Sequence, residues 1–178
     1  RKRITSNTLM SGLYCSALSL LFMYSLRSNY LVGWDIQSEY RIFLLTFEKL
    51  NWSVSNISHA YNTTLSLTIL PTILSQVTGI APLLIFKVLY PFIYAFSVPA
   101  VYLTLRNFTS KTVGFLSSFF FIAQLSFMQQ MPALARQEIA QLFFILALLV
   151  MFTKFLSNFQ KKVMFIVFGL CFIVSHYS

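Results

Sequence analysis

The chain has 178 residues, of which 57% are hydrophobic and only 10% are charged. A soluble domain is about one quarter charged, so this chain has too little polar surface for a soluble globule, and lipid is the expected solvent for most of it. The net charge of +9 comes from bases at the ends of apolar runs, which is typical of membrane topology signals and argues against a nucleic-acid-binding stripe.

Five apolar runs predict five membrane-spanning helices, because about 20 helical residues cross the ~30 Å hydrocarbon core. In chain order they cover residues 8–26, 80–105, 113–128, 139–152 and 163–178. The second run contains three prolines, which kink a helix but are tolerated in membranes when neighbouring groups satisfy the freed carbonyls. The predicted fold class is an all-α polytopic membrane protein, with residues 1–178 forming a single transmembrane module.

A long polar segment, residues 27–64, follows the first run and separates it from the second. Two short amphipathic helices are predicted near it, over residues 40–50 and 65–77. The second is too short to cross a bilayer and contains Pro71, so we expect it to lie at the membrane interface or to re-enter the membrane.

Basic residues at the ends of the runs predict the orientation of the module. They form three clusters: Arg1, Lys2 and Arg3; Arg106 and Lys111; and Lys154, Lys161 and Lys162. With five spans, all three clusters fall on one side, which the positive-inside rule makes cytoplasmic. We therefore expect a multi-pass protein of the cell membrane, with a cytoplasmic amino terminus and an outer loop at 27–64. Because the chain begins without Met and ends inside an apolar run, we expect it to be the amino-terminal part of a longer protein.

All four acids, Asp35, Glu39, Glu48 and Glu138, fall on the predicted outer side. Asp35 and Glu39 are four residues apart, so a helix would place both carboxylates on one face. Paired carboxylates repel each other, and a metal ion or a base often holds them together. An ordinary solvated loop with two acids is the alternative interpretation, and spacing alone favours it.

Four further ionisable side chains, Arg136, Glu138, His176 and Lys87, are expected toward the outer side. At ~1.5 Å per residue, Glu138 and His176 come to about the same level, with Arg136 slightly higher. Arg136 has the forked donors that suit a phosphate, but it could equally anchor at headgroups beside an acid that the helix dipole favours. His176 is either a packing residue or a metal ligand. Lys87 is expected at the outer interface, where a snorkelling lysine needs no function.

Three short motifs carry a resemblance to a known family. They are GWDIQSEY at 33–40, MPALARQE at 131–138 and HYS at 176–178. With a long outer loop that starts with an acid, they resemble the amino-terminal module of the GT-C superfamily of polyprenyl-phosphate-dependent glycosyltransferases. They are also similar to a group of large archaeal and bacterial membrane proteins placed near that superfamily.

The resemblance implies a glycosyltransferase that moves a sugar from a polyprenyl-phosphate donor to an acceptor at the outer membrane face. Asp35 would be the catalytic base, with Glu39 as its companion. Arg136 and Lys87 would bind the donor phosphate. The implied partners are membrane lipid and the lipid-linked sugar, with no nucleic acid.

The resemblance also implies a divalent metal, Mg²⁺ or Mn²⁺, held by Glu138, His176 and Asp35. Members of the family commonly carry an Asp-x-Asp pair in the second outer loop. The matching stretch here, Arg136-Gln137-Glu138, has only one acid. This departure puts metal dependence in doubt, although the superfamily also contains metal-independent members.

Two other functions remain open from the sequence. A transporter or flippase-like module would explain the proline-broken second run and the re-entrant segment, because transporters use such discontinuous helices. However, the chain shows no inverted repeat, and its acids gather on one side. A non-catalytic scaffold subunit of a membrane complex is the other alternative.

Overall fold

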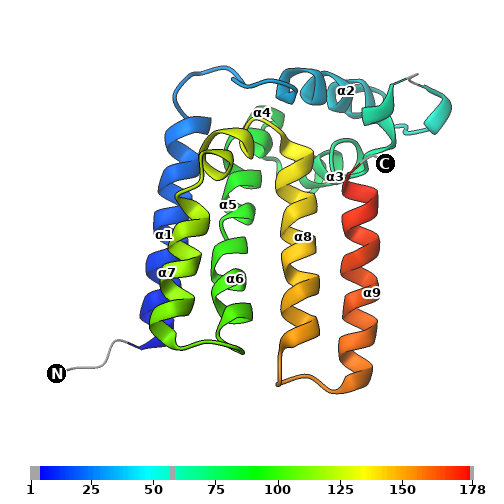
Figure 1. Cartoon of the computed structure of the whole chain (residues 1–178). Helices are drawn as coiled ribbons and strands as arrows, with labels where there is room; N and C mark the ends of the chain where they lie inside the picture. Colours follow the sequence, from blue (N-terminus) through cyan, green and yellow to red (C-terminus); the bar gives the residue numbers. More distant parts are fainter. Residues whose placement is uncertain (1–4, 57–58, 177–178) are drawn as a thin grey trace.

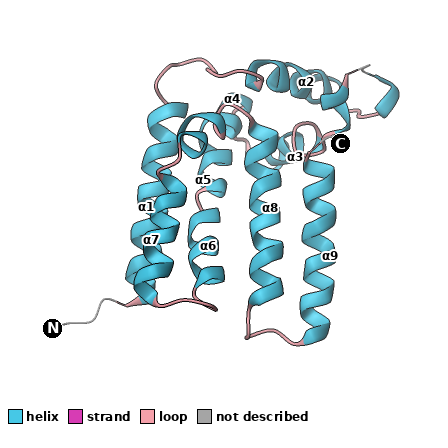
Figure 2. Ribbon diagram, in the orientation of Figure 1, coloured by secondary structure: helices cyan, strands magenta, loops and turns pink. Residues whose placement is uncertain are grey.

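The computed structural model describes residues 5–56 and 59–176. Its α-helices are α1 (Ser6–Ser25), α2 (Ile36–Lys49), α3 (Ile69–Thr78), α4 (Pro82–Leu84), α5 (Tyr90–Tyr94), α6 (Ser97–Leu105), α7 (Lys111–Ile122), α8 (Ala135–Phe152) and α9 (Asn158–Ser175). The long helices stand side by side, and α2 lies across one end of the bundle (Figures 1 and 2). No β-strand occurs within these two ranges, which confirms the predicted all-α fold class.

The predicted class of membrane protein is also confirmed. Four helical stretches in the described ranges are long and apolar enough to cross a membrane: α1, Pro82–Leu105, α8 and α9. The predicted run 113–128 is interrupted, because α7 ends at Ile122 and a separate π-helical turn occupies Ser126–Gln130. This part of the chain is rich in Gln and Ser, so it is less apolar than a membrane span requires. α7 nevertheless packs along α1 as part of the bundle.

Both carboxy-terminal helices begin earlier than predicted. Ser157 and Gln160 form a capping box, in which each side chain accepts a hydrogen bond from the other residue's backbone N–H. This arrangement satisfies two of the otherwise unbonded N–H groups and starts α9 five residues before the predicted position. α8 starts at Ala135, four residues early, which places Arg136 and Glu138 in its first turn.

The second predicted span is not a regular helix. Pro82 occupies the first position of α4, and a π-helical turn, Ile85–Leu89, joins α4 to α5. There the Tyr90 N–H bonds to the Ile85 carbonyl, one residue farther back than in an α-helix. Pro91 follows directly and has no N–H to donate, so the regular ladder cannot be kept at this point. The predicted proline-induced irregularity is therefore present.

The interior of the bundle contains two buried apolar clusters. One joins α1 to α6 and α8 and includes Leu13, Val98 and Leu142. The other lies beneath α2 and includes Phe43 and Phe86. The second cluster positions the site, because it buries one face of α2 against the ends of the long helices.

Charged residues divide between the two ends of the bundle. The turn from α6 to α7 carries Arg106 and Lys111, and the turn from α8 to α9 carries Lys154. Both turns lie at the end from which α1 starts (Figure 1), as the predicted five-helix path requires. Arg1 to Arg3 lie outside the described residues. Which end faces the cytoplasm stays a prediction.

The two short amphipathic helices predicted near the polar segment are both present, as α2 and α3. Leu50, in a left-handed conformation, ends α2, and Gly79 ends α3 in the same way. Glycine suits such a position because it has no Cβ to clash with the backbone. Between the two helices, 3₁₀ turns at Val54–Asn56 and Ala60–Thr63 lead the chain back over the bundle.

Candidate functional site

An ion cluster joins the start of α2 to the start of α8. Nη2 of Arg136 lies 3.0 Å from Oδ2 of Asp35, and Nη1 of the same guanidinium donates to Oε1 of Glu39. Arg136 and Glu39 are buried, with 4% and 0% of their side chains exposed, while Asp35 is 41% exposed. The structure therefore brings together Asp35, Glu39 and Arg136, which the sequence predicted only to lie on the same side of the membrane. The two carboxylates share one base, as their repulsion requires.

The same carboxylate of Glu39 caps α8 from another part of the chain. Its Oε2 accepts a hydrogen bond of 2.8 Å from the backbone N–H of Ala135, the first residue of α8. This N–H is one of the four that a helix leaves unbonded at its start. Leu134, the preceding residue, has no polar side chain that could cap the helix, so the distant Glu39 takes this role.

Gly33 allows α2 to approach α8 this closely. A Cβ atom at Gly33 would lie 2.6 Å from Cβ and 2.7 Å from Cα of Ala133, which is closer than real atoms pack. Ile36, with 2% exposure, and Phe43, with none, anchor the same face of α2 in the buried cluster below. The small residue at 33 and the apolar positions of α2 together hold Asp35 and Glu39 against Arg136.

The two carboxyl groups differ in their ionisation. Hydrogen bonds from the Tyr61 hydroxyl and from Arg136 lower the pKa of Asp35 below its ordinary value, so this carboxylate is ionised at neutral pH. Burial raises the pKa of Glu39 to about 7, although Arg136 and the Ala135 N–H oppose this shift. Near neutral pH, a substantial fraction of Glu39 therefore carries a proton.

Tyr61 completes the cluster, and sequence reasoning missed it. Its hydroxyl donates to Oδ2 of Asp35 at 2.8 Å, and its ring lies 4.5 Å from Cζ of Arg136 in a cation–π contact. The 3₁₀ turn Ala60–Thr63 brings this side chain over the cluster. In the sequence, Tyr61 is one of several aromatic residues of the segment 27–64, and that pattern does not specify a partner 26 residues away.

Glu138 is the most unusual side chain in this region. It is 0% exposed, and both of its carboxylate oxygens lack a hydrogen-bond partner among the residues that the structure describes. It lies within electrostatic range of Glu39, Tyr90 and Tyr94. The hydroxyl of Tyr90 donates elsewhere, to the backbone carbonyl of Ser66. A buried acid without a partner is costly, and in a membrane helix it is by default a candidate functional residue.

Lys87 does not contact the ion cluster through any hydrogen bond or salt bridge of the described chain. It is buried, with 6% exposure, and its Nζ donates to the backbone carbonyls of Ser28 and Tyr30. The sequence-based interpretation as a snorkelling lysine is therefore wrong, because the amine points to protein carbonyls instead of solvent. Lys87 ties the loop after α1 to the π-helical turn.

His176 lies apart from Asp35, in a groove between α8 and α9. This groove has a volume of about 330 Å³, and Gln137, Gln141, Phe144 and His176 are among its lining residues. Tyr177 and Ser178, the rest of that motif, lie outside the described residues. The carboxylate of Asp35 instead bonds Arg136 and Tyr61.

The predicted metal ligands do not form a metal site in this arrangement. Over residues 5–56 and 59–176, no group of three or more His, Cys, Asp or Glu side chains is placed to hold a metal ion. Asp35, Glu138 and His176 are therefore not assembled as a ligand set. The predicted Mg²⁺ or Mn²⁺ stays a prediction that these residues alone do not support.

Comparison with known proteins identifies no relative: no protein family, no curated protein and no solved structure matches the chain. Function must therefore be argued from the site itself, because a helical bundle alone does not define an activity. The site offers one ionised, partly exposed carboxylate beside a fixed guanidinium and a tyrosine. Behind them lie two buried acids, Glu39 and Glu138.

Proposed function

We propose that this chain is a module of a membrane glycosyltransferase, which moves a sugar from a polyprenyl-phosphate donor to an acceptor at the α2 end of the bundle. The observation that carries the proposal is the state of Asp35, an ionised and partly exposed carboxylate fixed at the end of an apolar bundle. A lipid-linked donor reaches such a site from the bilayer, and an acceptor reaches it from water. The predicted orientation places this end outside the cell.

Asp35 would act on the acceptor in an inverting transfer. The acceptor oxygen or nitrogen attacks the anomeric carbon, the carbon–oxygen bond to the phosphate breaks, and the phosphate leaves with the electron pair. The acceptor proton passes to the Asp35 carboxylate. A carboxylate with a lowered pKa is a weak base, which suits a transition state with oxocarbenium character, where the proton moves late.

Arg136 would stabilise the leaving phosphate. In the resting arrangement two carboxylates share its guanidinium. Because the pKa of Glu39 is about 7, its protonation removes one of the two negative charges that Arg136 offsets, so the cluster becomes neutral and repels a phosphate less. Lys87 is a second cation near this end, and its neutral carbonyl partners are weaker ligands than a phosphate.

The test is transfer of radiolabelled sugar from a polyprenyl-phosphate donor by the purified full-length protein in lipid. Asp35→Asn should reduce transfer at least 100-fold, because it removes the base while keeping the shape. Glu48→Gln is the matched control, since Glu48 is an exposed acid on the same helix and should keep activity. If Asp35→Asn transfers sugar like the wild type, the proposed role of Asp35 is wrong.

A second function, proton-coupled transport, is favoured by Glu138. A fully buried acid without a hydrogen-bond partner in the described ranges, beside another acid, is typical of a proton relay in a membrane helix. Proteoliposomes that enclose a pH-sensitive dye would distinguish the two functions. Transport predicts proton flux that Glu138→Gln abolishes and Asp35→Asn retains, whereas the transferase predicts no flux above that of empty liposomes.

A further inference from the structure

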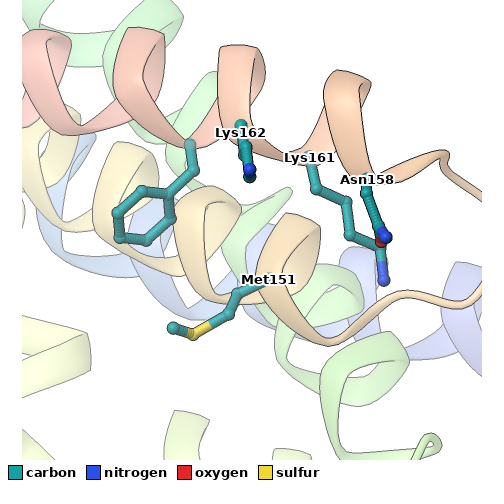
Figure 3. A pocket seen from close by; sticks show the side chains of 5 residues that line it. Met151, Asn158, Lys161 and Lys162 are labelled. Carbon is teal, nitrogen blue, oxygen red and sulfur yellow. The ribbon is translucent and has the colours of Figure 1, made fainter.

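The turn between α8 and α9 forms a basic groove at the opposite end of the bundle from the ion cluster. The groove has a volume of about 360 Å³ and is lined by Met151, Asn158, Lys161, Lys162 and Phe165. Figure 3 shows the side chains of Asn158, Lys161 and Lys162 reaching from α9 toward the part of α8 that carries Met151. Two cations, one amide and two apolar side chains thus line one concave surface.

Among the described residues, no acidic side chain forms a salt bridge with the cations of this groove. All four acids of the sequence lie in or beside α2 or in the first turn of α8, at the other end of the bundle. In the described ranges, both salt bridges belong to the ion cluster around Arg136. Lys161 and Lys162 are therefore available to an anionic ligand.

The apolar and basic parts of the groove lie at successive depths. Asn158 is the first residue of α9, and Met151 is the second-last residue of α8, so the groove opens where two apolar helices end. Lys161 is the fourth residue of α9 and Lys162 the fifth, so they lie where the first turn ends and the second begins. Phe165 lies about one turn deeper, or ~5 Å. From the end of the bundle inward, the groove thus presents an amide, two amines and an aromatic ring. This order matches the change from headgroup to acyl chain in one leaflet.

We propose that this groove binds an anionic phospholipid, whose phosphate contacts Lys161, Lys162 and Asn158 and whose acyl chain packs on Met151 and Phe165. Basic pockets between transmembrane helices are a known form of site for such headgroups. The start of α9 adds the partial positive charge of a helix amino terminus. The site is independent of the proposed transferase activity, which is located at the other end of the bundle.

The test measures retention of one defined lipid by the purified protein, using native mass spectrometry from detergent micelles. Phosphatidylglycerol should be retained, and phosphatidylcholine, which carries no net charge, should be retained much less. Lys161→Gln combined with Lys162→Gln should weaken phosphatidylglycerol binding about tenfold or more, because each base near a headgroup contributes substantially. Phe165→Gln should weaken it without a change of charge.

The matched control is Lys111→Gln combined with Lys154→Gln. These two exposed lysines lie at the same end and carry the same charge, but neither lines the groove. The control should retain phosphatidylglycerol within about twofold of the wild type, as expected for exposed charges without a specific partner. If it weakens binding as much as the groove variant does, the attraction is general to this basic end, and the proposed site is wrong.

Soluble glycerol phosphate separates a lipid site from a site for free phosphate. It carries the charged headgroup without acyl chains, so it should fail to displace phosphatidylglycerol when both are present at equal concentration. Equal displacement would show that Met151 and Phe165 contribute nothing and would overturn the lipid assignment. Thermal unfolding of both double variants provides a check that the bundle remains folded.

Discussion

The two ends of the bundle carry their charges in opposite ways. At the α2 end, Arg136 is buried and bonded to two carboxylates, and one of these, on Glu39, also caps α8. At the other end, Lys161 and Lys162 lie in an open groove with no acid nearby. The first end is compensated by acids of the same chain, whereas the basic groove has no salt bridge among the described residues.

This difference separates what charge does for the fold from what it does for binding. A buried ion network is expensive to disrupt, because removing one member leaves another charge buried and unpaired. Exposed bases contribute little to stability, since water and salt screen them. Mutations at the α2 end should therefore mainly lower the free energy of unfolding, and mutations at the basic end should mainly weaken ligand binding.

Removal of Arg136 should have the largest effect. Arg136→Met keeps much of the side-chain volume but leaves Glu39 buried without its base, so we expect a loss of about 3–5 kcal/mol in the free energy of unfolding. Thermal unfolding in detergent at neutral pH would measure it. Lys154→Met at the basic end should change stability by less than about 0.5 kcal/mol. Equal effects of the two variants would contradict the proposed difference between the ends.

The pH dependence of stability should depend on Glu39. Its pKa is about 7 in the folded protein and 4.5 ordinarily, so between these values the unfolded chain has released a proton that the folded chain keeps. Stability should therefore fall as pH rises from about 4.5 to 7, by on the order of 2–3 kcal/mol. In Glu39→Gln the melting temperature should depend little on pH across this range, whereas Glu48→Gln should keep the pH dependence of the wild type. A slope that persists in Glu39→Gln would assign the titration to another group.

A methyl group at Gly33 should separate α2 from α8. In Gly33→Ala the new Cβ would collide with Ala133, so we expect a loss of about 1–3 kcal/mol. Gly12→Ala and Gly169→Ala are controls, because a Cβ at either position meets nothing within 4 Å. Both should be neutral or slightly stabilising, since alanine favours a helix more than glycine does. If Gly33→Ala does not change the free energy of unfolding, the α2 end tolerates a wider separation between residue 33 and Ala133.

The apolar runs were sufficient to predict the fold class and most of the long helices. Hydrophobic length is a local property, so the sequence shows it directly, and the same holds for the spacing that pairs Asp35 with Glu39. The partner choice of Arg136 is not local, because it depends on how α2 folds back over the bundle. The sequence suggested a phosphate ligand for Arg136, and the structure shows two carboxylates of its own chain.

Lys87 and Tyr61 show the same limit of sequence-based prediction. The exposure of Lys87 was predicted wrongly, and the contacts of Tyr61 were not predicted. Depth counted along a straight helix predicted a snorkelling, solvent-facing Lys87, but two carbonyls of the loop after α1 bury its amine. The contacts of Tyr61 could not be predicted, because an aromatic residue in a loop has no periodicity that would specify its partner. Residues whose role comes from contacts between distant segments were therefore the ones that sequence reasoning misplaced or missed.

The smallest predicted effect concerns the hydroxyl of Tyr61. Tyr61→Phe keeps the ring over Arg136 but removes the hydrogen bond to Asp35, so stability at neutral pH should fall by about 0.5–1.5 kcal/mol. That bond helps to lower the pKa of Asp35, and a lowered carboxyl pKa contributes stability that is lost as pH falls through it.

The difference between Tyr61→Phe and the wild type should therefore narrow on acidification, and melting temperatures at several pH values would show this. Tyr30→Phe is the control, since Tyr30 is 80% exposed, and it should match the wild type at every pH. A difference that stays constant down to the pH at which Asp35 is protonated would mean that the hydroxyl acts through packing. In that case the ionised state of Asp35, on which the comparison of the two ends depends, would rest on Arg136 alone.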